Sequence, residues 1–203
     1  MRRSTALASL VAVLALPLTA AAIETMSWNV DADHTEVNFK VRHFFTPVTG
    51  TFTSYDVELI FDQDDPTNSR VNVSIDVASV STGNERRDNH LRTDDWFGAD
   101  TYGKITFAST SVKKTGVNEY VAVGTLTIKD VSKQVELPFT LLGVKAIPEM
   151  MREMLGGVTQ VASFQANLTI DRTAFGVGTG MWGETAVVGA KVEIELLVEA
   201  NVR

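Results

Sequence analysis

Apolar and polar residues alternate along most of the chain. The first clear run places Val37, Phe39 and Val41 between polar neighbours, and seven further runs of the same kind follow. Alternation with a period of two is typical of β-strands that bury one face. The eight runs lie at residues 37–41, 57–61, 71–77, 104–112, 120–129, 135–141, 164–170 and 188–198.

Short turns join most of these runs, so we expect an antiparallel meander. The longest run, residues 188–198, has eleven residues, which gives a strand of about 35 Å. A long sheet removes its open edges most completely by closing on itself. The sequence therefore predicts an all-β fold, an eight-stranded antiparallel up-and-down β-barrel. Eight strands enclose enough space for a packed core or for one ligand.

Alternation alone does not say which face lies inside, because an outer-membrane barrel also alternates, with its apolar side chains facing lipid. That class needs two aromatic girdles, and three Tyr and three Trp are too few for them. The chain also ends Ala-Asn-Val-Arg rather than on an aromatic residue. We therefore favour a soluble barrel with apolar side chains inside.

Two segments interrupt the alternation and predict short helical segments. Residues 82–97 are polar, with Arg86 and His90 four positions apart, where they are neighbours on a helix. Residues 148–155 begin with proline and are followed by two glycines, an order that suits a helix. We expect both segments to lie at ends of the barrel.

Residues 1–22 predict a cleaved secretory signal. Two arginines precede an apolar stretch, and Ala20 and Ala22 supply the small residues of a cleavage site before Ile23. The apolar stretch is too short to span a bilayer. We therefore expect a single mature domain, residues 23–203, that is exported to the periplasm and has no membrane span.

Charge and cysteine content exclude several classes of function. Removal of the signal leaves 16 basic and 25 acidic residues, a net charge of about −9. Phosphate backbones repel such a chain, so we predict no nucleic-acid partner. The sequence has no cysteine, which excludes thiol nucleophiles, thiolate metal sites and disulfides. Stability must then come from an apolar core.

Histidine and glycine motifs give no sharp catalytic or metal pattern. His34, His43 and His90 are candidate metal ligands or bases, but their spacing matches no known metal motif. Hydrogen-bonded histidines at the barrel rim are the favoured interpretation. The G-x-G-x-G at residues 176–180 lacks a surrounding βα unit, so we interpret it as a strand connection. We predict no catalytic residue, no metal and no cofactor.

One segment gathers positive charge in this acidic chain: Arg86, Arg87, His90 and Arg92. It is either an anion clamp for a ligand head group or a structural plug that Asp88 neutralises.

Methionines form a second unusual segment. Met150, Met151, Met154 and Leu155 form a soft apolar surface. We favour packing of this surface against the barrel end over a mobile lid.

Several stretches together resemble one family, the bacterial YceI-like proteins. In chain order they are DADHTEVNFKVRH, VTGTF, SVSTGNERRDNHLRTDDWF, YGKITFAST, GTLTIKDVSKQVELPF and IDRTAFGVG, and they span nearly all of the predicted mature chain. Gly103 stands where the family usually has proline, and Asp130 where it usually has glycine. The methionine-rich stretch is not typical of the family.

The resemblance implies an exported, lipocalin-like barrel that binds polyisoprenoids. The expected ligand is a long-chain isoprenoid, either a polyprenyl phosphate or an isoprenoid quinone, with its tail among inward side chains and its head at the mouth. Size and strand parity select the lining phenylalanines, and the charged and methionine-rich segments add the rest. The predicted ligand-binding residues are Phe39, Phe52, Phe107, Phe139, Phe164, Phe175, Arg86, His90, Arg92, Trp96, Met150 and Met154.

Two other classes of function stay open at this point. One is an enzyme that acts on a lipid, with the rim histidines as acid or base. The other is an interaction protein whose barrel is filled, and a continuous apolar cavity would separate it from a binding protein. The sequence leaves open the identity of the lipid and whether the chain forms a homodimer.

Overall fold

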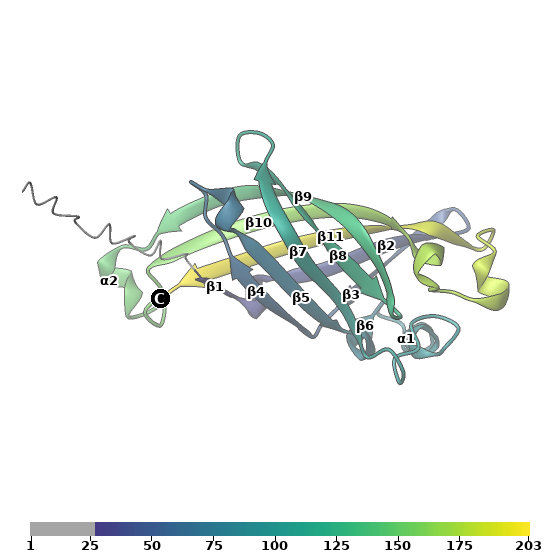
Figure 1. Ribbon diagram of the computed structural model, residues 1–203. Helices are drawn as coiled ribbons and strands as arrows, with labels where there is room; N and C mark the ends of the chain where they lie inside the picture. Colours follow the sequence, from purple (N-terminus) through teal and green to yellow (C-terminus); the bar gives the residue numbers. More distant parts are fainter. Residues whose placement is uncertain (1–26) are drawn as a thin grey trace, which may run out of the picture.

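The computed structural model describes residues 27–203, which form a closed antiparallel β-barrel (Figure 1). The predicted signal, residues 1–22, lies outside the described residues. The elements in chain order are β1 (Ser27–Val30), η1 (Ala32–His34), β2 (Glu36–His43), β3 (Thr46–Phe52), β4 (Tyr55–Ile60), η2 (Pro66–Asn68), β5 (Arg70–Asp76), η3 (Val77–Ser79), β6 (Val80–Ser81), α1 (Glu85–Arg92), β7 (Lys104–Lys114), β8 (Glu119–Ile128), β9 (Val131–Ala146), α2 (Glu149–Arg152), β10 (Gln160–Asp171), η4 (Arg172–Phe175), η5 (Gly180–Gly183) and β11 (Val188–Val202).

Eleven strands fill eight positions in the barrel, because each of the first three positions holds two strands. β1 and β2 pair with successive parts of β11, β4 and β3 pair with β1 and β2, and β5 and β6 pair with β4 and β3. β7 to β10 follow in order, and the pairing of β1 with both β4 and β11 closes the barrel. The predicted eight-stranded up-and-down barrel is confirmed.

Aspartate side chains start two of the three interruptions. Asp31 accepts a hydrogen bond from the backbone N–H of Asp33 at 3.0 Å and caps η1 between β1 and β2. Asp76 accepts one from the N–H of Ala78 at 3.0 Å and caps η3 between β5 and β6. Such local bonds offer the backbone an alternative to the sheet ladder, so each strand turns briefly before it continues.

Both predicted helical segments contain a helix. α1 begins after Asn84, whose side chain accepts the N–H of Arg87 at 3.0 Å. α2 is one turn long, and Pro148 lies at its N-cap rather than at its first helical position. From residue 27 onward, no helix combines the length and the apolar composition that a bilayer crossing requires.

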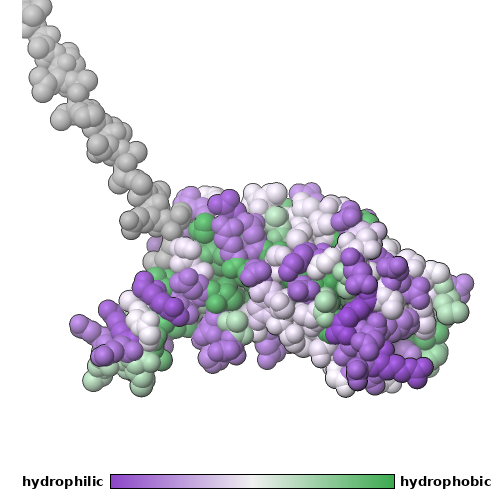
Figure 2. Space-filling view, turned by 90° about the horizontal axis from the view of Figure 1, so that it is seen from below, coloured by the Kyte–Doolittle hydropathy of each residue, from purple (hydrophilic) through white to green (hydrophobic). Residues whose placement is uncertain are grey.

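The barrel has two different ends (Figure 1). The mouth is formed by the β2–β3 turn, the β8–β9 turn, residues 82–103 with α1, and residues 172–187. The other end carries the β4–β5 and β7–β8 connections, α2 and the C-terminus. On the face seen in Figure 2, hydrophilic side chains gather over α1, at the mouth.

Aromatic side chains close the end that carries α2. We call this cluster the plug. Phe61 lies edge-on to Tyr120 and to Phe164, with ring centroids 5.2 and 5.1 Å apart. The indole N–H of Trp28 donates to the carbonyl of Phe61 at 3.1 Å. The buried members of the plug are Trp28, Phe61, Tyr120, Leu141, Ala162, Phe164 and Ala200.

Candidate functional site

A cavity of about 690 Å³ lies inside the barrel between the plug and the mouth. Its walls are apolar because the alternating strands turn one face inward, with Val37, Phe39 and Val41 on β2 and Ile194 and Leu196 on β11. The exposed side chain of Arg86, on α1, also lines the cavity, which places its opening at the mouth.

Charged groups that line the cavity are all cationic or histidine. Arg86, Arg87 and Arg172 line it together with His43 and His90, and none of the described lining residues is acidic. This bias is local, since the whole chain has a net charge of −7. The arrangement therefore favours an anionic group at the mouth of an apolar cavity.

Arg172 is a buried cation held by backbone carbonyls. It is 3% exposed, and its guanidinium donates to the carbonyls of Gly189, Val177, Trp182 and Val188 at 2.7–2.9 Å. Burial lowers the pKa of the Arg172 guanidinium, and neighbouring Asp171 partly offsets this effect.

The guanidinium of Arg172 also lies over the ring of Trp96, 5.1 Å from its centroid. Gly178 makes this packing possible. It has a φ of +78°, and a Cβ there would lie only 2.1 Å from Nη1 of Arg172. The G-x-G-x-G segment is thus a strand connection shaped around a buried arginine.

Arg87 and Asp88 attach α1 to the strand before it. Arg87 Nε donates to the hydroxyl of Thr82 at 2.7 Å, and its Nη2 donates to the Thr82 carbonyl at 2.9 Å. Buried Asp88 accepts the backbone N–H of Thr82 at 2.8 Å. Asp88 and Arg87 are therefore joined by their shared partner Thr82. Asp88 forms no ion pair with Arg92, whose guanidinium donates to the carbonyl of Val80.

Two indoles and an imidazole pack together at the mouth. The ring centroids of Trp96 and Trp182 are 5.6 Å apart, and His90 lies edge-on to both, at 5.9 and 5.2 Å. The indole N–H of Trp96 donates to Nε2 of His90 at 3.3 Å. This group joins α1 to η5, so residues from two distant segments form one rim of the cavity.

Half of the predicted ligand-binding residues line this cavity, and their contact with a ligand stays a prediction. The lining residues are Phe39, Phe52, Phe107, Arg86, His90 and Trp96.

The other six do not line this cavity, and their contact with a ligand also stays a prediction. Phe139 and Phe164 lie at the plug, because parity gives the face of a strand but not the height along the barrel. Phe175 is packed in the core outside the lining. Arg92 donates to the carbonyls of Ala78 and Val80, both at 2.8 Å. Met150 and Met154 lie exposed on the α2 segment, at the opposite end from the mouth.

Two lining residues outside the predicted set, His43 and Arg172, carry a signal in the sequence. His43 continues the inward series Val37, Phe39, Val41, and Arg172 continues the inward series of Leu168 and Ile170. Both are polar ends of apolar runs, so parity alone would have placed them inside. Trp182 lies outside any alternating run, and only the fold brings it to Trp96.

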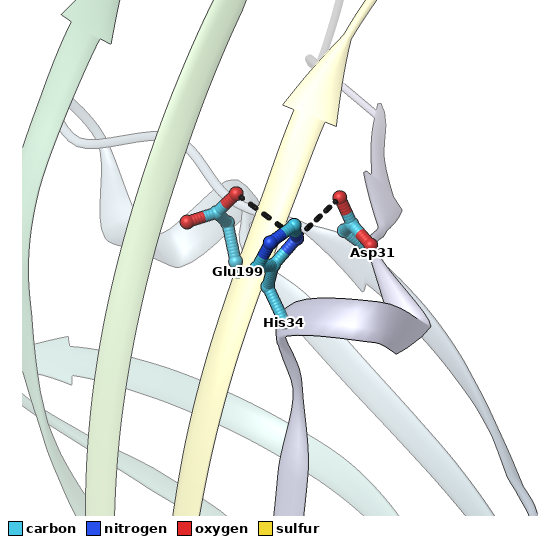
Figure 3. Close-up of side chains that lie close together, drawn as sticks. All are labelled: Asp31, His34 and Glu199. Carbon is cyan, nitrogen blue, oxygen red and sulfur yellow. Dashed lines mark hydrogen bonds and ion pairs between the residues drawn. The ribbon is translucent and has the colours of Figure 1, made fainter.

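A second cluster of titratable side chains lies away from the cavity, where η1 meets β11 (Figure 3). Nδ1 of His34 is 3.1 Å from Oδ2 of Asp31 and 3.9 Å from Oε1 of Glu199. The hydrogen bond to Asp31 raises the pKa of His34, and the same bond lowers the pKa of Asp31.

One ligand atom from each of these three residues lies within 4.8 Å of the others, so they could hold a divalent cation. An imidazolium that bridges two carboxylates uses the same atoms and needs no metal.

The fold and the cavity define a class: antiparallel barrels that enclose an apolar ligand-sized space with one open end. The YceI-like domain model matches residues 28–200, so the chain belongs to the YceI-like family.

Relatives of similar length support this assignment. A UPF0312 protein of Staphylococcus epidermidis is 33% identical over 178 residues, which cover 86% of this chain and 97% of that protein. Protein YceI of Escherichia coli O157:H7 is 40% identical over 114 residues, covering 56% of this chain and 59% of the relative.

Solved structures show the same fold. BcnA of Burkholderia cenocepacia superimposes with a TM-score of 0.76 at 29% identity, over 84% of this chain and 99% of that chain. A polyisoprenoid-binding domain from Saccharophagus degradans superimposes with a TM-score of 0.62 over 87% of this chain and 98% of the other. Its identity is 16%, so this second similarity concerns the fold.

Proposed function

We propose that this protein binds a long-chain isoprenoid lipid, with the tail inside the barrel and an anionic head group, such as a prenyl phosphate, at the mouth. One observation carries the proposal: the apolar cavity ends at the plug and is lined at its mouth by arginine and histidine without any carboxylate among the described lining residues. The shared fold of the polyisoprenoid-binding domain supports it.

The tail would supply most of the affinity. Each buried methylene contributes about 0.8 kcal/mol, so a few isoprene units bind well without specific polar contacts. A cavity of about 690 Å³ lies within the range of known ligand sites, about 300–1,000 Å³. This cavity favours a binding protein over the filled-barrel alternative.

Arg86 is the arginine available for a head group. Arg172 and Arg87 already donate to carbonyl and hydroxyl oxygens, whereas the side chain of Arg86 is exposed at the mouth and makes no hydrogen bond to residues 27–203. A phosphate would gain charge-assisted hydrogen bonds there. An isoprenoid quinone is the second candidate, because its uncharged oxygens need only a donor from a side chain such as His43.

We propose a binding protein rather than a lipid-modifying enzyme. Nε2 of His90 already accepts the indole N–H of Trp96, and His34 lies outside the cavity at η1. The predicted export to the periplasm belongs to this proposal, since a carrier of membrane lipids works where lipids must cross water. N-terminal sequencing of the protein from a periplasmic extract tests the cleavage before Ile23.

Extraction of the purified protein with organic solvent and mass spectrometry of the extract tests the function. We expect a prenyl lipid. A titration with a short-chain prenyl phosphate should also change the fluorescence of Trp96 and Trp182, which line the cavity. An empty extract together with no fluorescence response to either prenyl phosphate or quinone would contradict the proposal.

A further inference from the structure

Two apolar tips project from the mouth of the barrel. The first is the β2–β3 turn, where Phe44 is 53% and Phe45 92% exposed. The second is η5, where Met181 is 78% exposed. Large apolar side chains that lie this far out of the core often mark a contact surface.

Both tips adjoin the cavity. His43, directly before Phe44, lines the cavity, and so does Trp182, directly after Met181. The N–H of Phe44 donates to the carbonyl of Val187 at 2.7 Å, so the turn is fixed to the segment that follows η5. The tips therefore stand at the opening through which a ligand would pass.

Phenylalanine is a poor choice for this turn if folding is the only requirement. His43 pairs with Thr46, so Phe44 and Phe45 are the two central residues of a tight hairpin. Such positions favour glycine, asparagine or aspartate, and Phe44 has a φ of +49°, which bulky residues rarely adopt. The chain thus tolerates backbone strain in order to present two aromatic rings to the outside.

The two tip segments themselves carry cationic and no acidic side chains. Asp95 lies beside the second tip, because its backbone carbonyl accepts the N–H of Thr179 at 2.7 Å. Residues 41–48 and 180–183 contain Arg42 and His43 but no acidic residue, in a chain with a net charge of −7. Arg86 adds an exposed cation at the mouth. Glu184 is the one acidic residue directly adjoining either segment in sequence.

We propose that Phe44, Phe45 and Met181 dock the mouth of the barrel onto an anionic lipid bilayer, where the isoprenoid enters and leaves. This inference rests on the proposed function. Apolar side chains such as phenylalanine bury their surface at the boundary between head groups and acyl chains, and nearby cations are attracted to anionic head groups. Passage of the lipid through water would expose the full apolar length of its tail. Docking at the mouth lets the tail move directly from the bilayer into the cavity.

The opposite end of the molecule supplies a matched control. Met150 in α2 and Met154 shortly after it are also exposed. The plug separates that end from the cavity, so contact with a bilayer there would give a lipid no entry. Exposed apolar surface is therefore present at both ends, but only the mouth combines it with an opening.

The test is flotation of the protein with vesicles of phosphatidylethanolamine and phosphatidylglycerol. The variant F44G/F45N removes both rings and places glycine where φ is positive, so it should fold at least as well as the wild type. We expect its affinity for these vesicles to fall by about tenfold or more. The control M150S/M154S should bind as the wild type does, and vesicles of phosphatidylcholine alone should bind the wild type less.

Three outcomes would overturn the inference. They are no flotation of the wild type, equal loss in both variants, and unchanged binding of F44G/F45N. A vesicle-free titration with prenyl phosphate separates this inference from the proposed function, because F44G/F45N should keep its fluorescence response. Wild-type protein that floats but takes up no prenyl lipid would retain the docking surface and contradict the proposed function.

Discussion

The arginines near the mouth differ in what already binds them, and this difference decides what each can do. Arg172 has carbonyl partners on four residues, and Arg87 has both the hydroxyl and the carbonyl of Thr82. Arg92 bridges two carbonyls of the η3–β6 segment. Among these four arginines, only Arg86 has a side chain that makes no hydrogen bond within the described chain. For this charged segment, the anion-clamp hypothesis therefore applies to Arg86, and the hypothesis of a purely structural role applies to Arg87 and Arg92.

Separate substitutions of Arg86 and Arg92 should have different effects. We expect Arg86→Gln to weaken prenyl phosphate binding by about 1.5–3 kcal/mol, the value of one charge-assisted hydrogen bond, with little change in stability. Arg92→Gln should lower the free energy of unfolding by about 1–3 kcal/mol, because two carbonyls lose their donor. Fluorescence titration and urea unfolding measure the two effects.

Arg86→Lys is the control for charge, and it should recover part of the affinity that Arg86→Gln loses. Quinone binding should stay unchanged in both Arg86 variants, since a quinone carries no charge. Equal loss of phosphate and quinone affinity would instead show that Arg86 supports the structure of the mouth.

His34 should make stability depend on pH. Its pKa is raised from the ordinary 6.5 by Asp31 and Glu199, so its stabilising effect is fully present below pH 6.5. The effect is lost as pH rises through the higher pKa of the folded state. We expect His34→Gln to lower stability more at about pH 5.5 than at about pH 8.5 in urea unfolding. A difference that is independent of pH would contradict this assignment.

The pKa of Asp31 sets the acid limit of the same effect. It is lowered from 3.8, so the contribution of its carboxylate is present above 3.8 and disappears as pH falls through the folded pKa. A chelator should leave the stability difference between wild type and His34→Gln unchanged. If the chelator removes that difference, the cluster at η1 binds a metal ion.

At the scale of elements, alternation predicted the barrel because every inward position repeats with a period of two. Phe39, Phe52 and Phe107, chosen by parity, line the cavity, whereas Phe139 and Phe164 lie at the plug, because parity assigns no height along the axis. The interruptions of the first three barrel strands escaped prediction, since they depend on local side-chain bonds.

The β8–β9 turn is an element whose stability should be open to improvement. Lys129 and Asp130 have φ values of +50° and +60°, a pair that a type I′ turn requires. We expect Asp130→Gly to raise the free energy of unfolding by about 0.5–1 kcal/mol, because relief of left-handed strain exceeds the entropic cost of glycine. Urea unfolding measures this gain.

Asp100→Gly is the matched control, since Asp100 is exposed at the same end and has no positive φ. This variant should be neutral or slightly less stable. A gain of the same size in both variants would mean that loss of acidic charge, and not relief of backbone strain, is responsible.

The molecule as a whole is asymmetric, and the asymmetry gives the cavity a floor and an entrance. Phe139 lies at the floor, because it packs against both the core around the cavity and the plug. Its ring stacks on Tyr120 at a centroid distance of 5.2 Å and lies 6.2 Å from Phe164. On the proposed function, the plug sets the depth available to a lipid tail, and the mouth selects the head group independently.

Removal of the Phe139 ring should consequently change which tail lengths fit. We expect Phe139→Ala to deepen the cavity and to favour longer prenyl phosphates, by about 0.8 kcal/mol for each additional methylene that becomes buried. The same substitution should lower the free energy of unfolding by about 3–5 kcal/mol. Titration with a series of chain lengths measures the preference.

Phe175→Ala is the control, because Phe175 is buried away from both the lining and the plug. Its loss should lower stability without changing the preferred length. An unchanged preference in a folded Phe139→Ala variant would mean that tail length is limited elsewhere in the barrel.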